Sequence, residues 1–432
     1  MNACMLAYTF YESDNRVMRY AETLARRGDI VDVISLRRPG ESARVRINGV
    51  NVLRVQRRTK GEQAKLVYLA KLVSFFLISM MVLSVRHWRR PYDLVHVHNV
   101  PDFLVCAAWF PKWTGAKLIL DIHDVLPEFY ANKFKCTDQS WIFRALVWTE
   151  RLSVHFADHV ILANHLWLER VVKRSSAAAG KCSVELNYPD TSVFRPRGRG
   201  PKNEKFVIIF PGSLNFHQGL DIAIRAFARF REQVPLAEFH IYGEGGEKAN
   251  LQELVRSLSL ESQVHFLGVT PLREVAKVME NADLGVVPKR ADSFGNEAFS
   301  TKILEFMCLR VPVVVSSTRV DRYYFNPAVV KFFDSGNTES MALAMLSLAH
   351  DPDLREQLAG RAFHFVQRFT WEQNQSLYVD LVDSLVSGCF RTCAPVQRVP
   401  PALWCEAPPP FQPSPDNSAP EASHERCELL QP

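Results

Sequence analysis

The sequence lacks the features that mark several classes of protein. It contains nine cysteines, yet no two of them form a CxxC pair and none clusters with histidine at metal-ligand spacing. We therefore expect reduced cysteines and no cysteine-bound metal. No GxGxxG motif follows the first predicted strand, which argues against a dinucleotide oxidoreductase. Polar residues at 11–14 come too early for an apolar export signal, so the expected compartment is the cytoplasm.

Long hydrophobic runs are also scarce. The most apolar stretch, residues 72–85, has about 14 residues, whereas a membrane-spanning helix needs ~20. The basic residues that flank this stretch include Arg54, Arg57, Arg86 and Arg90. Two interpretations stay open. One is a buried helix, favoured for the central residues, and the other is an interfacial helix with Phe75, Phe76 and Met80 at the acyl boundary of an anionic membrane.

Length and composition indicate two globular domains. The chain has 432 residues, of which 47% are hydrophobic and 23% charged, and this length exceeds what one hydrophobic core usually supports. Short apolar runs alternate with helical patterns in both halves of the chain, which predicts two α/β domains with parallel sheets. We place these domains at 1–190 and 191–370, a helix that crosses back to the first domain at 371–390, and a disordered proline-rich tail at 391–432.

Two carboxylates lie eight positions apart around a predicted helix start in the second domain. They are Glu297 and Glu305, and a continuous helix would separate them by roughly 12 Å. That distance suits a diphosphate-bridged ligand, with one carboxylate at a sugar and the other at a ribose. Backbone amides near Ser300 and Thr301 would meet the phosphates. The alternative is that Glu297 merely favours the helix start and Glu305 pairs with a surface lysine.

The segment from Glu297 to the strand at 311–316 resembles the E-x7-E signature of the retaining GT-B glycosyltransferases of family 4. This resemblance implies two doubly wound, Rossmann-like parallel-sheet domains that face each other across a cleft. It also implies that Glu297 contacts the donor sugar and Glu305 the ribose, with Phe299, Ser300 and Thr301 in the same donor-binding segment.

A glycine loop follows the first strand of the second domain. Gly212 allows the backbone to approach a phosphate, and the loop resembles a donor-binding loop of the family. Ser213 and Gln218, which we also assign to the donor, stand where many members carry Arg and Lys. The positive charge that neutralises the departing diphosphate is therefore expected elsewhere, first on Lys302 and then on Lys289. For Lys302 or Lys289 taken singly, a solvated lysine that contacts no ligand is about as good an interpretation.

The first domain contributes a second set of residues after its predicted strands. The residues around His98 and His123 resemble a family pattern of histidines and carboxylates, which implies that His123 lies beside the reacting sugar. The predicted catalytic residues are thus His123, Glu297 and Lys302. The predicted acceptor-side residues are Asn15, Arg16, His98, Asp124 and Glu128. Two further glycines, Gly243 and Gly268, match donor-binding positions of the family, the latter near the base.

The resemblance implies transfer with retention, without a protein nucleophile. We expect no metal, because no DxD pair ends a strand, and no cofactor beyond the nucleotide-sugar donor. The expected acceptor is a saccharide or a lipid-linked oligosaccharide of bacterial surface-polysaccharide synthesis. The protein would then sit at the inner face of the plasma membrane, in peripheral contact with anionic lipid, and bind no nucleic acid. Two alternatives stay open: a nucleotide-sugar epimerase on the same fold, and a non-catalytic subunit of a polysaccharide-assembly complex.

Overall fold

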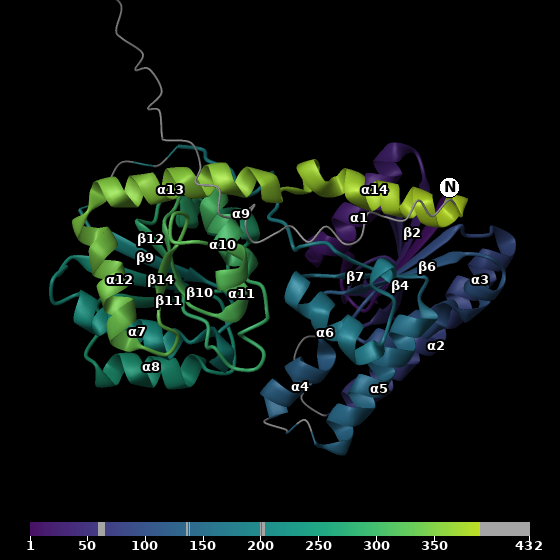
Figure 1. The fold of residues 1–432 in the computed structure, drawn as a ribbon, viewed down its shortest axis with the longest axis horizontal. Coiled ribbons are helices and arrows are strands. Elements are labelled where there is room, and N and C mark those ends of the chain that lie inside the picture. Colours follow the sequence, from purple (N-terminus) through teal and green to yellow (C-terminus); the bar gives the residue numbers. More distant parts are fainter. Residues whose placement is uncertain (59–64, 135–136, 138, 199, 201–203, 389–432) are drawn as a thin grey trace, which may run out of the picture.

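The computed structural model describes residues 1–58, 65–134, 137, 139–198, 200 and 204–388. The chain forms two α/β domains that lie side by side (Figure 1). The tail predicted to be disordered at 391–432 lies outside the described residues.

The first domain is built on an eight-stranded sheet with the order β3-β4-β2-β1-β5-β6-β7-β8. All neighbouring strands are parallel except β3 and β4. The strands are β1 (Asn2–Ala7), β2 (Ile30–Arg37), β3 (Arg44–Ile47), β4 (Val50–Arg57), β5 (Leu94–His98), β6 (Lys117–Ile122), β7 (His159–Leu162) and β8 (Cys182–Val184). The helices are α1 (Asn15–Arg27), α2 (Lys65–Arg89), α3 (Trp109–Trp113), α4 (Leu126–Phe134), α5 (Trp141–Phe156) and α6 (His165–Ser175). Central strands such as β5 and β7 are buried along their whole length, as apolar strands covered on both faces should be.

The second domain carries a six-stranded, fully parallel sheet with the order β11-β10-β9-β12-β13-β14. Its strands are β9 (Phe206–Pro211), β10 (Ala237–Tyr242), β11 (Val264–Gly268), β12 (Leu284–Val287), β13 (Val313–Ser316) and β14 (Lys331–Phe333). Its helices are α7 (Leu220–Phe230), α8 (Lys248–Ser257), α9 (Leu272–Glu280), α10 (Thr301–Cys308), α11 (Arg319–Tyr324), α12 (Thr338–His350) and α13 (Pro352–Val366). Short 3-10 turns occur in both domains. Those of the first are η1 (Tyr11–Ser13), η2 (Asp102–Ala108) and η3 (Ala179–Lys181), and those that follow are η4 (Phe216–Gln218) and η5 (Gln367–Phe369). The expected fold class, two doubly wound domains, is confirmed.

Strand order reverses between β1 and β5 in the first sheet and between β9 and β12 in the second. In open parallel sheets, ligands bind outside the carboxyl ends of the strands at such switch points. The loops after these strands are therefore where a site is expected.

The last helix, α14 (Trp371–Ser387), runs from the second domain onto the first (Figure 1). Trp371 and Tyr378 are buried in the core of the first domain. The indole of Trp371 donates to Thr23 Oγ1 at 2.9 Å, and the hydroxyl of Tyr378 lies 3.0 Å from His96 Nδ1. This helix therefore ties the two domains together along one side.

The first domain covers only one face of helix α2, so the central residues do not form a fully buried helix. The helix is 25 residues long, and its segment Val67–Arg89 is long and apolar enough to cross a membrane by length and composition alone. Only 22% of its most apolar window is buried. One face packs on the domain through Leu72, Phe75, Ser79 and Leu83. The opposite face exposes Leu69, Val73, Leu77, Met81 and Val85, each four residues from the next. The placement of Phe75 at a lipid boundary is wrong, because it is a core residue.

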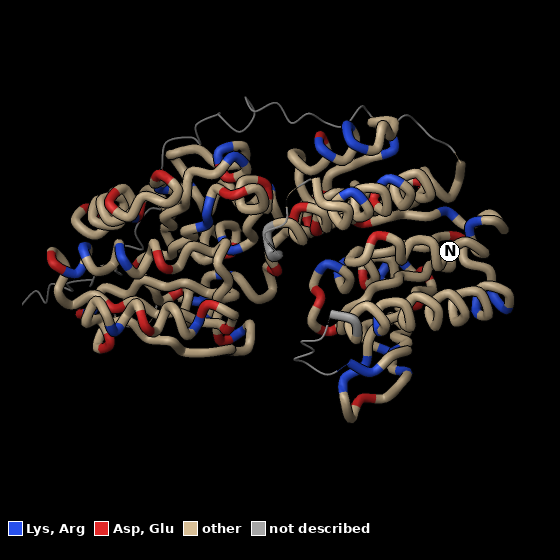
Figure 2. The backbone as a smooth tube through the Cα atoms, turned by 90° about the horizontal axis from the view of Figure 1, so that it is seen from below, with Lys and Arg blue, Asp and Glu red and all other residues tan. Residues whose placement is uncertain are grey.

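The basic flanks of α2 are largely engaged within the protein. Arg54 is buried and pairs with Glu12, while Arg86 and Arg90 both pair with Asp32, at 2.8 and 3.1 Å. Lys and Arg are interspersed with Asp and Glu over both domains (Figure 2). The absence of nucleic-acid binding stays a prediction.

Candidate active site

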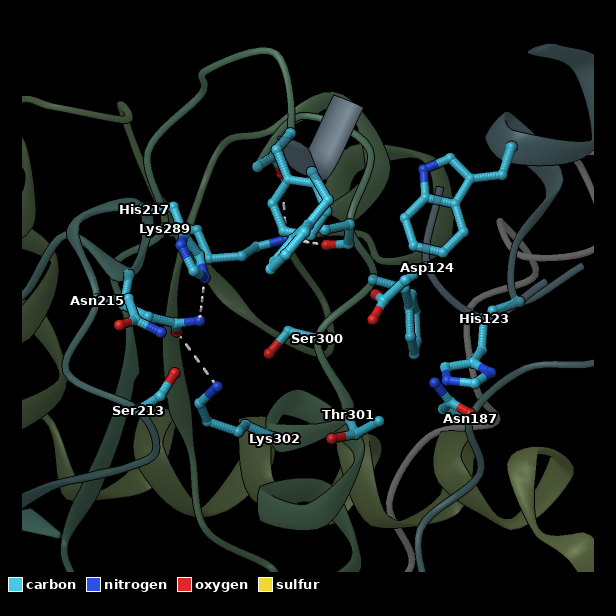
Figure 3. Close-up of a pocket in the computed structure, with 18 residues that line it drawn as sticks. His123, Asp124, Asn187, Ser213, Asn215, His217, Lys289, Ser300, Thr301 and Lys302 are labelled. Carbon is cyan, nitrogen blue, oxygen red and sulfur yellow. Dashed lines mark hydrogen bonds between the residues drawn. The ribbon is translucent and has the colours of Figure 1, made fainter. Parts of the chain in front are cut away.

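A cleft of about 310 Å³ opens between the two domains. Figure 3 shows His123, Asp124 and Asn187 on one side, Ser213, His217 and Lys302 on the other, and Ser300 and Thr301 between them. The lining residues of the first domain are His123, Asp124, Phe129, Ala163, Trp167 and Asn187. Those of the second domain are Ser213, Asn215, His217, Gln218, Lys289, Phe294, Gly295, Ala298, Phe299, Ser300, Thr301 and Lys302.

His123 and Asp124 form the loop that follows β6. Asn99, at the end of the neighbouring strand β5, holds this loop: its Oδ1 accepts from the backbone N–H of His123 at 3.0 Å, and its Nδ2 donates to the Asp124 carbonyl at 2.6 Å. Nδ1 of His123 is buried and has no hydrogen-bond partner among the described residues. Burial raises the pKa of Asp124, and His123 opposes that shift. Both residues line the cleft, so the sequence placed this loop correctly.

The start of α10 forms the opposite wall. Ser300 is the N-cap residue in an extended conformation, and its side chain makes no capping hydrogen bond. Its Oγ is buried and unpartnered in the described part of the chain. The first-turn amides of a helix lack intrahelical partners and carry the positive end of the helix dipole. This wall can therefore receive an anionic group.

Lys302, in the first turn of α10, points into the cleft (Figure 3). Its Nζ donates to Gln218 Oε1 at 3.3 Å and lies 5.5 Å from the centre of the Phe210 ring. No described carboxylate pairs with it within 4 Å. Burial lowers the pKa of Lys302 to about 8, and Glu305 opposes that shift. A Cβ at Gly212 would lie 2.7 Å from Lys302 Cε, so this glycine makes room for the lysine.

Gly243 and Gly268 support the Gly212 loop from behind. A Cβ at Gly243 would lie 1.9 Å from the carbonyl oxygen of Gly212, and the Gly243 N–H donates to the Gly268 carbonyl at 2.7 Å. Neither lines the cleft. Their assignment to donor binding stays a prediction, and the structure gives both a role in shaping the loop.

Lys289 does not supply free charge, contrary to expectation. It is buried, its Nζ lies 3.0 Å from Asp321 Oδ2, and it donates to the Ala298 carbonyl at 2.7 Å. The neighbouring Arg290 pairs with Asp221 at 2.6 Å. Both cations are neutralised by carboxylates, so Lys302 is the cation that remains available among the described residues that line the cleft.

Glu297 lies in a turn before α10, so the assumption of a continuous helix between the two carboxylates is wrong. Its Oε1 accepts from Arg170 of the first domain, and its carbonyl accepts from Asn164 Nδ2 at 2.9 Å. Its Oε2 is buried and has no partner in the described ranges. Burial raises the pKa of Glu297, opposed by Arg170. Glu297 itself does not line the cleft, but its neighbours Gly295 and Ala298 do. The residue therefore lies at the border of the cleft.

Glu305 lies one turn into α10 and is partly buried. Burial raises the pKa of its carboxyl, while Lys302 and a hydrogen bond from Thr301 oppose that shift. It is not a lining residue of the cleft. Its contact with a ribose stays a prediction.

Most predicted acceptor-side residues do not face the cleft. Arg16 is buried and makes two bonds of 2.7 Å to the Asp121 carboxylate, while His98 is buried with Nδ1 2.9 Å from the same carboxylate. Glu128 is buried and pairs with Arg170 at 2.7 Å and with Arg174 at 2.8 Å. Asn15 is exposed at the start of α1, outside the cleft. None of these four residues lines the cleft, and partners inside the protein occupy the three buried side chains. Their assignment to the acceptor stays a prediction.

Several lining residues were missed. His217 stands in the glycine loop beside Gln218 and could have been noticed there. Asn187 and Trp167 carried no such signal, because neither belongs to a motif. They reach the cleft only through the packing of the first domain.

Replacing Arg16 with methionine is expected to destabilise the protein by about 3–5 kcal/mol, because it leaves the buried Asp121 carboxylate without its guanidinium. Chemical denaturation measures this loss. The double variant Arg16→Met/Asp121→Leu should recover part of the stability, since the buried Asp121 carboxylate is removed together with its guanidinium. A loss below about 1 kcal/mol in the single variant would contradict the structural role of this pair.

Comparison with known proteins adds to this geometry. The family model for glycosyl transferases group 1 matches residues 195–365, and the model for the glycosyl transferase 4-like domain matches residues 13–184. An uncharacterised glycosyltransferase of Methanocaldococcus jannaschii is 26% identical over 377 residues, which cover 82% of this chain and 89% of that protein.

Solved structures share the fold. HepE of Anabaena, crystallised with UDP-glucose, matches with a TM-score of 0.65 and 17% identity, covering 88% of this chain and 99% of HepE. WaaG, a glycosyltransferase involved in lipopolysaccharide biosynthesis, matches with a TM-score of 0.62 and 17% identity, covering 89% of this chain and 99% of WaaG.

Proposed function

The chain belongs to the group 1 glycosyltransferases and has the GT-B fold, and we propose that it transfers a sugar from a nucleotide-sugar donor with retention of anomeric configuration. One observation carries this proposal: the amino end of α10, with Lys302, faces the same cleft as His123 of the other domain. A diphosphate bound at the amino end of α10 would hold its sugar toward His123. The UDP-glucose bound by HepE supports a donor of this class.

The residues of the cleft divide the chemistry between them. The first-turn amides of α10 bind the diphosphate, and the ammonium of Lys302 stabilises the negative charge that develops as the glycosidic bond breaks. His123 lies beside the sugar. The acceptor hydroxyl attacks the same face that the phosphate leaves, and the departing phosphate takes its proton. No protein nucleophile is needed, and we keep the expectation that neither metal nor cofactor takes part.

Arg170 determines how Glu297 can meet the sugar. The guanidinium of Arg170 bridges Glu128 and Glu297, so one oxygen of Glu297 is held and the other, Oε2, is left unpartnered in the described chain. A buried carboxylate oxygen without a hydrogen-bond partner readily accepts a hydrogen bond from a sugar hydroxyl. Arg170 therefore acts as a positioning residue for Glu297.

A lipid-linked acceptor, of the kind used in bacterial surface-polysaccharide synthesis, fits the exposed face of α2. Trp88 and Trp113 are each 80% exposed, on α2 and on its neighbour α3. Tryptophan is favoured where an apolar phase meets water, so this face suits contact with a membrane surface. WaaG, which shares the fold, is involved in lipopolysaccharide biosynthesis, and this agrees with a role in surface-polysaccharide synthesis.

A donor screen tests the proposal. The full chain is incubated with UDP-, GDP- and ADP-sugars, hydrolysis or transfer is measured, and binding is followed by calorimetry. One donor should be bound and slowly hydrolysed, and faster turnover should require an acceptor. Consumption that gives an isomerised nucleotide-sugar without an acceptor would indicate an epimerase. Binding without turnover by any acceptor would indicate a non-catalytic subunit.

The double substitution Leu77→Asp/Met81→Asp should abolish flotation with anionic vesicles, because it places two charges on the exposed face of α2. The control is Leu343→Asp, which alters an equally exposed leucine on α12 of the second domain and should float like the unaltered chain. If the unaltered chain does not float with anionic vesicles, the proposed membrane contact is wrong.

A further inference from the structure

Three side chains with metal-ligating atoms meet on the edge of the second sheet, away from the cleft. Glu238 and His240 lie two residues apart on β10 and so share one face of that strand. His265 lies on the edge strand β11, and His240 and His265 are register partners. The ligand atoms of the three residues all lie within 4.8 Å of one another.

The distances fit a small cation. Nε2 of His240 lies 2.9 Å from Glu238 Oε2, and Nε2 of His265 lies 3.7 Å from Glu238 Oε1. Ligands placed about 2.0–2.1 Å from a tetrahedral zinc ion are separated by roughly 3.3 Å. The two observed separations bracket that value, so small rotations of these side chains would complete three corners of a tetrahedron.

The three side chains are also accessible. Glu238, His240 and His265 are 17%, 24% and 35% exposed, so an ion can reach them from solvent and keep water as a fourth ligand.

A second histidine and aspartate group, in the first domain, provides a contrast. There His96, His98 and Asp121 also lie close together, but Asp121 is held by two bonds from the buried Arg16. The fixed guanidinium already supplies the positive charge. At the sheet edge the cation is Lys205, which is 50% exposed and contacts a single oxygen of Glu238 at 2.6 Å. A flexible, solvated lysine is far easier to displace.

We propose that Glu238, His240 and His265 bind one divalent transition-metal ion, such as zinc, on the exposed face of the β10–β11 edge. Two imidazoles and one carboxylate suit zinc, nickel, cobalt or copper, whereas magnesium and calcium prefer sites made of oxygen alone. The ion would link the edge strand β11 to β10, and these two strands end at Gly268 and near Gly243 behind the donor loop. The site is independent of the proposed transfer reaction.

Calorimetric titration of the full chain with zinc chloride tests the proposal. Cysteines at the end of the chain, such as Cys405 and Cys427, offer other ligands, so the measurement is a comparison between variants. His265→Ala and Glu238→Gln should each weaken one binding event by at least about tenfold, since loss of a ligand costs more than loss of a residue that merely orients one. The matched control is His350→Ala, an exposed histidine at the end of α12 in the same domain, which should titrate like the unaltered chain.

Two further measurements guard against misfolding. Lys205→Met should bind zinc more tightly than the unaltered chain, because the competing ammonium is gone. Zinc should raise the thermal unfolding midpoint of the unaltered chain and of His350→Ala but not of Glu238→Gln, which is nearly isosteric and should unfold normally without metal. Titrations of His265→Ala and Glu238→Gln that superimpose on that of the control would overturn the proposal.

Discussion

Lys302→Ala is expected to lower kcat by about 10²–10³. The ammonium of Lys302 faces the cleft without a carboxylate partner among the described residues, whereas Lys289 and Arg290 are neutralised by Asp321 and Asp221. Charge on the departing diphosphate is greatest in the transition state, so kcat should fall more than donor affinity. Steady-state kinetics with the donor identified by the screen give both values.

The pH dependence provides an independent readout for Lys302. Burial lowers its pKa to about 8, so the ammonium is present below that pH and is lost as the pH rises through it. kcat/KM, which reports the free enzyme, should therefore decline above about pH 8. Lys302→Arg should keep part of the activity and move this decline to higher pH, because a guanidinium stays protonated.

Lys277→Ala serves as the control for Lys302. This lysine lies on α9 of the same domain, is 55% exposed and pairs with Glu274 at 3.0 Å. Its loss should leave kcat and the pH profile unchanged. Full turnover by Lys302→Ala, or a pH decline that is the same in Lys302→Arg, would remove the assignment of the phosphate cation.

What the sequence predicted well was local. The alternation of apolar runs gives the two sheets, and parallel strands bring the loops that follow β6, β9 and β12 to the carboxyl edges of those sheets. His123, Ser300 and Lys302 were therefore placed correctly in the cleft. The exposed face of α2 was not predictable, because an apolar helix shows no sign in its own sequence of which side the domain will cover.

Three predicted residues lie off the cleft for one physical reason. Arg16, His98 and Glu128 follow or end strands in the sequence, as active-site residues often do, but each side chain contacts a partner far away in the chain. Arg16 meets Asp121 across 105 positions, and Glu128 meets Arg174 across 46. Polar side chains at strand ends serve buried networks in some places and open clefts in others, and the three-dimensional arrangement of their partners decides between the two.

Glu297→Gln is expected to reduce kcat by about 10³, because the neutral amide cannot accept strongly from a sugar hydroxyl at the position of Oε2. Glu305→Ala should chiefly raise the donor KM, since its proposed contact is with the ribose. Arg170→Met should lower kcat less than Glu297→Gln, because it keeps the carboxylate and removes one of the two guanidinium groups beside it, the other being Arg319 at 3.6 Å.

The double variant distinguishes a role of Arg170 in positioning Glu297 from a role in the stability of the domain interface. If Arg170 acts through Glu297, the double variant Arg170→Met/Glu297→Gln should be no slower than Glu297→Gln alone, since residues that act as a unit are not additive. Lys173→Ala is the control: this lysine is exposed on the same helix and should leave kcat unchanged. Additive losses in the double variant would show that Arg170 supports the domain interface by itself. Full turnover by Glu297→Gln would mean that its unpartnered oxygen never meets the donor.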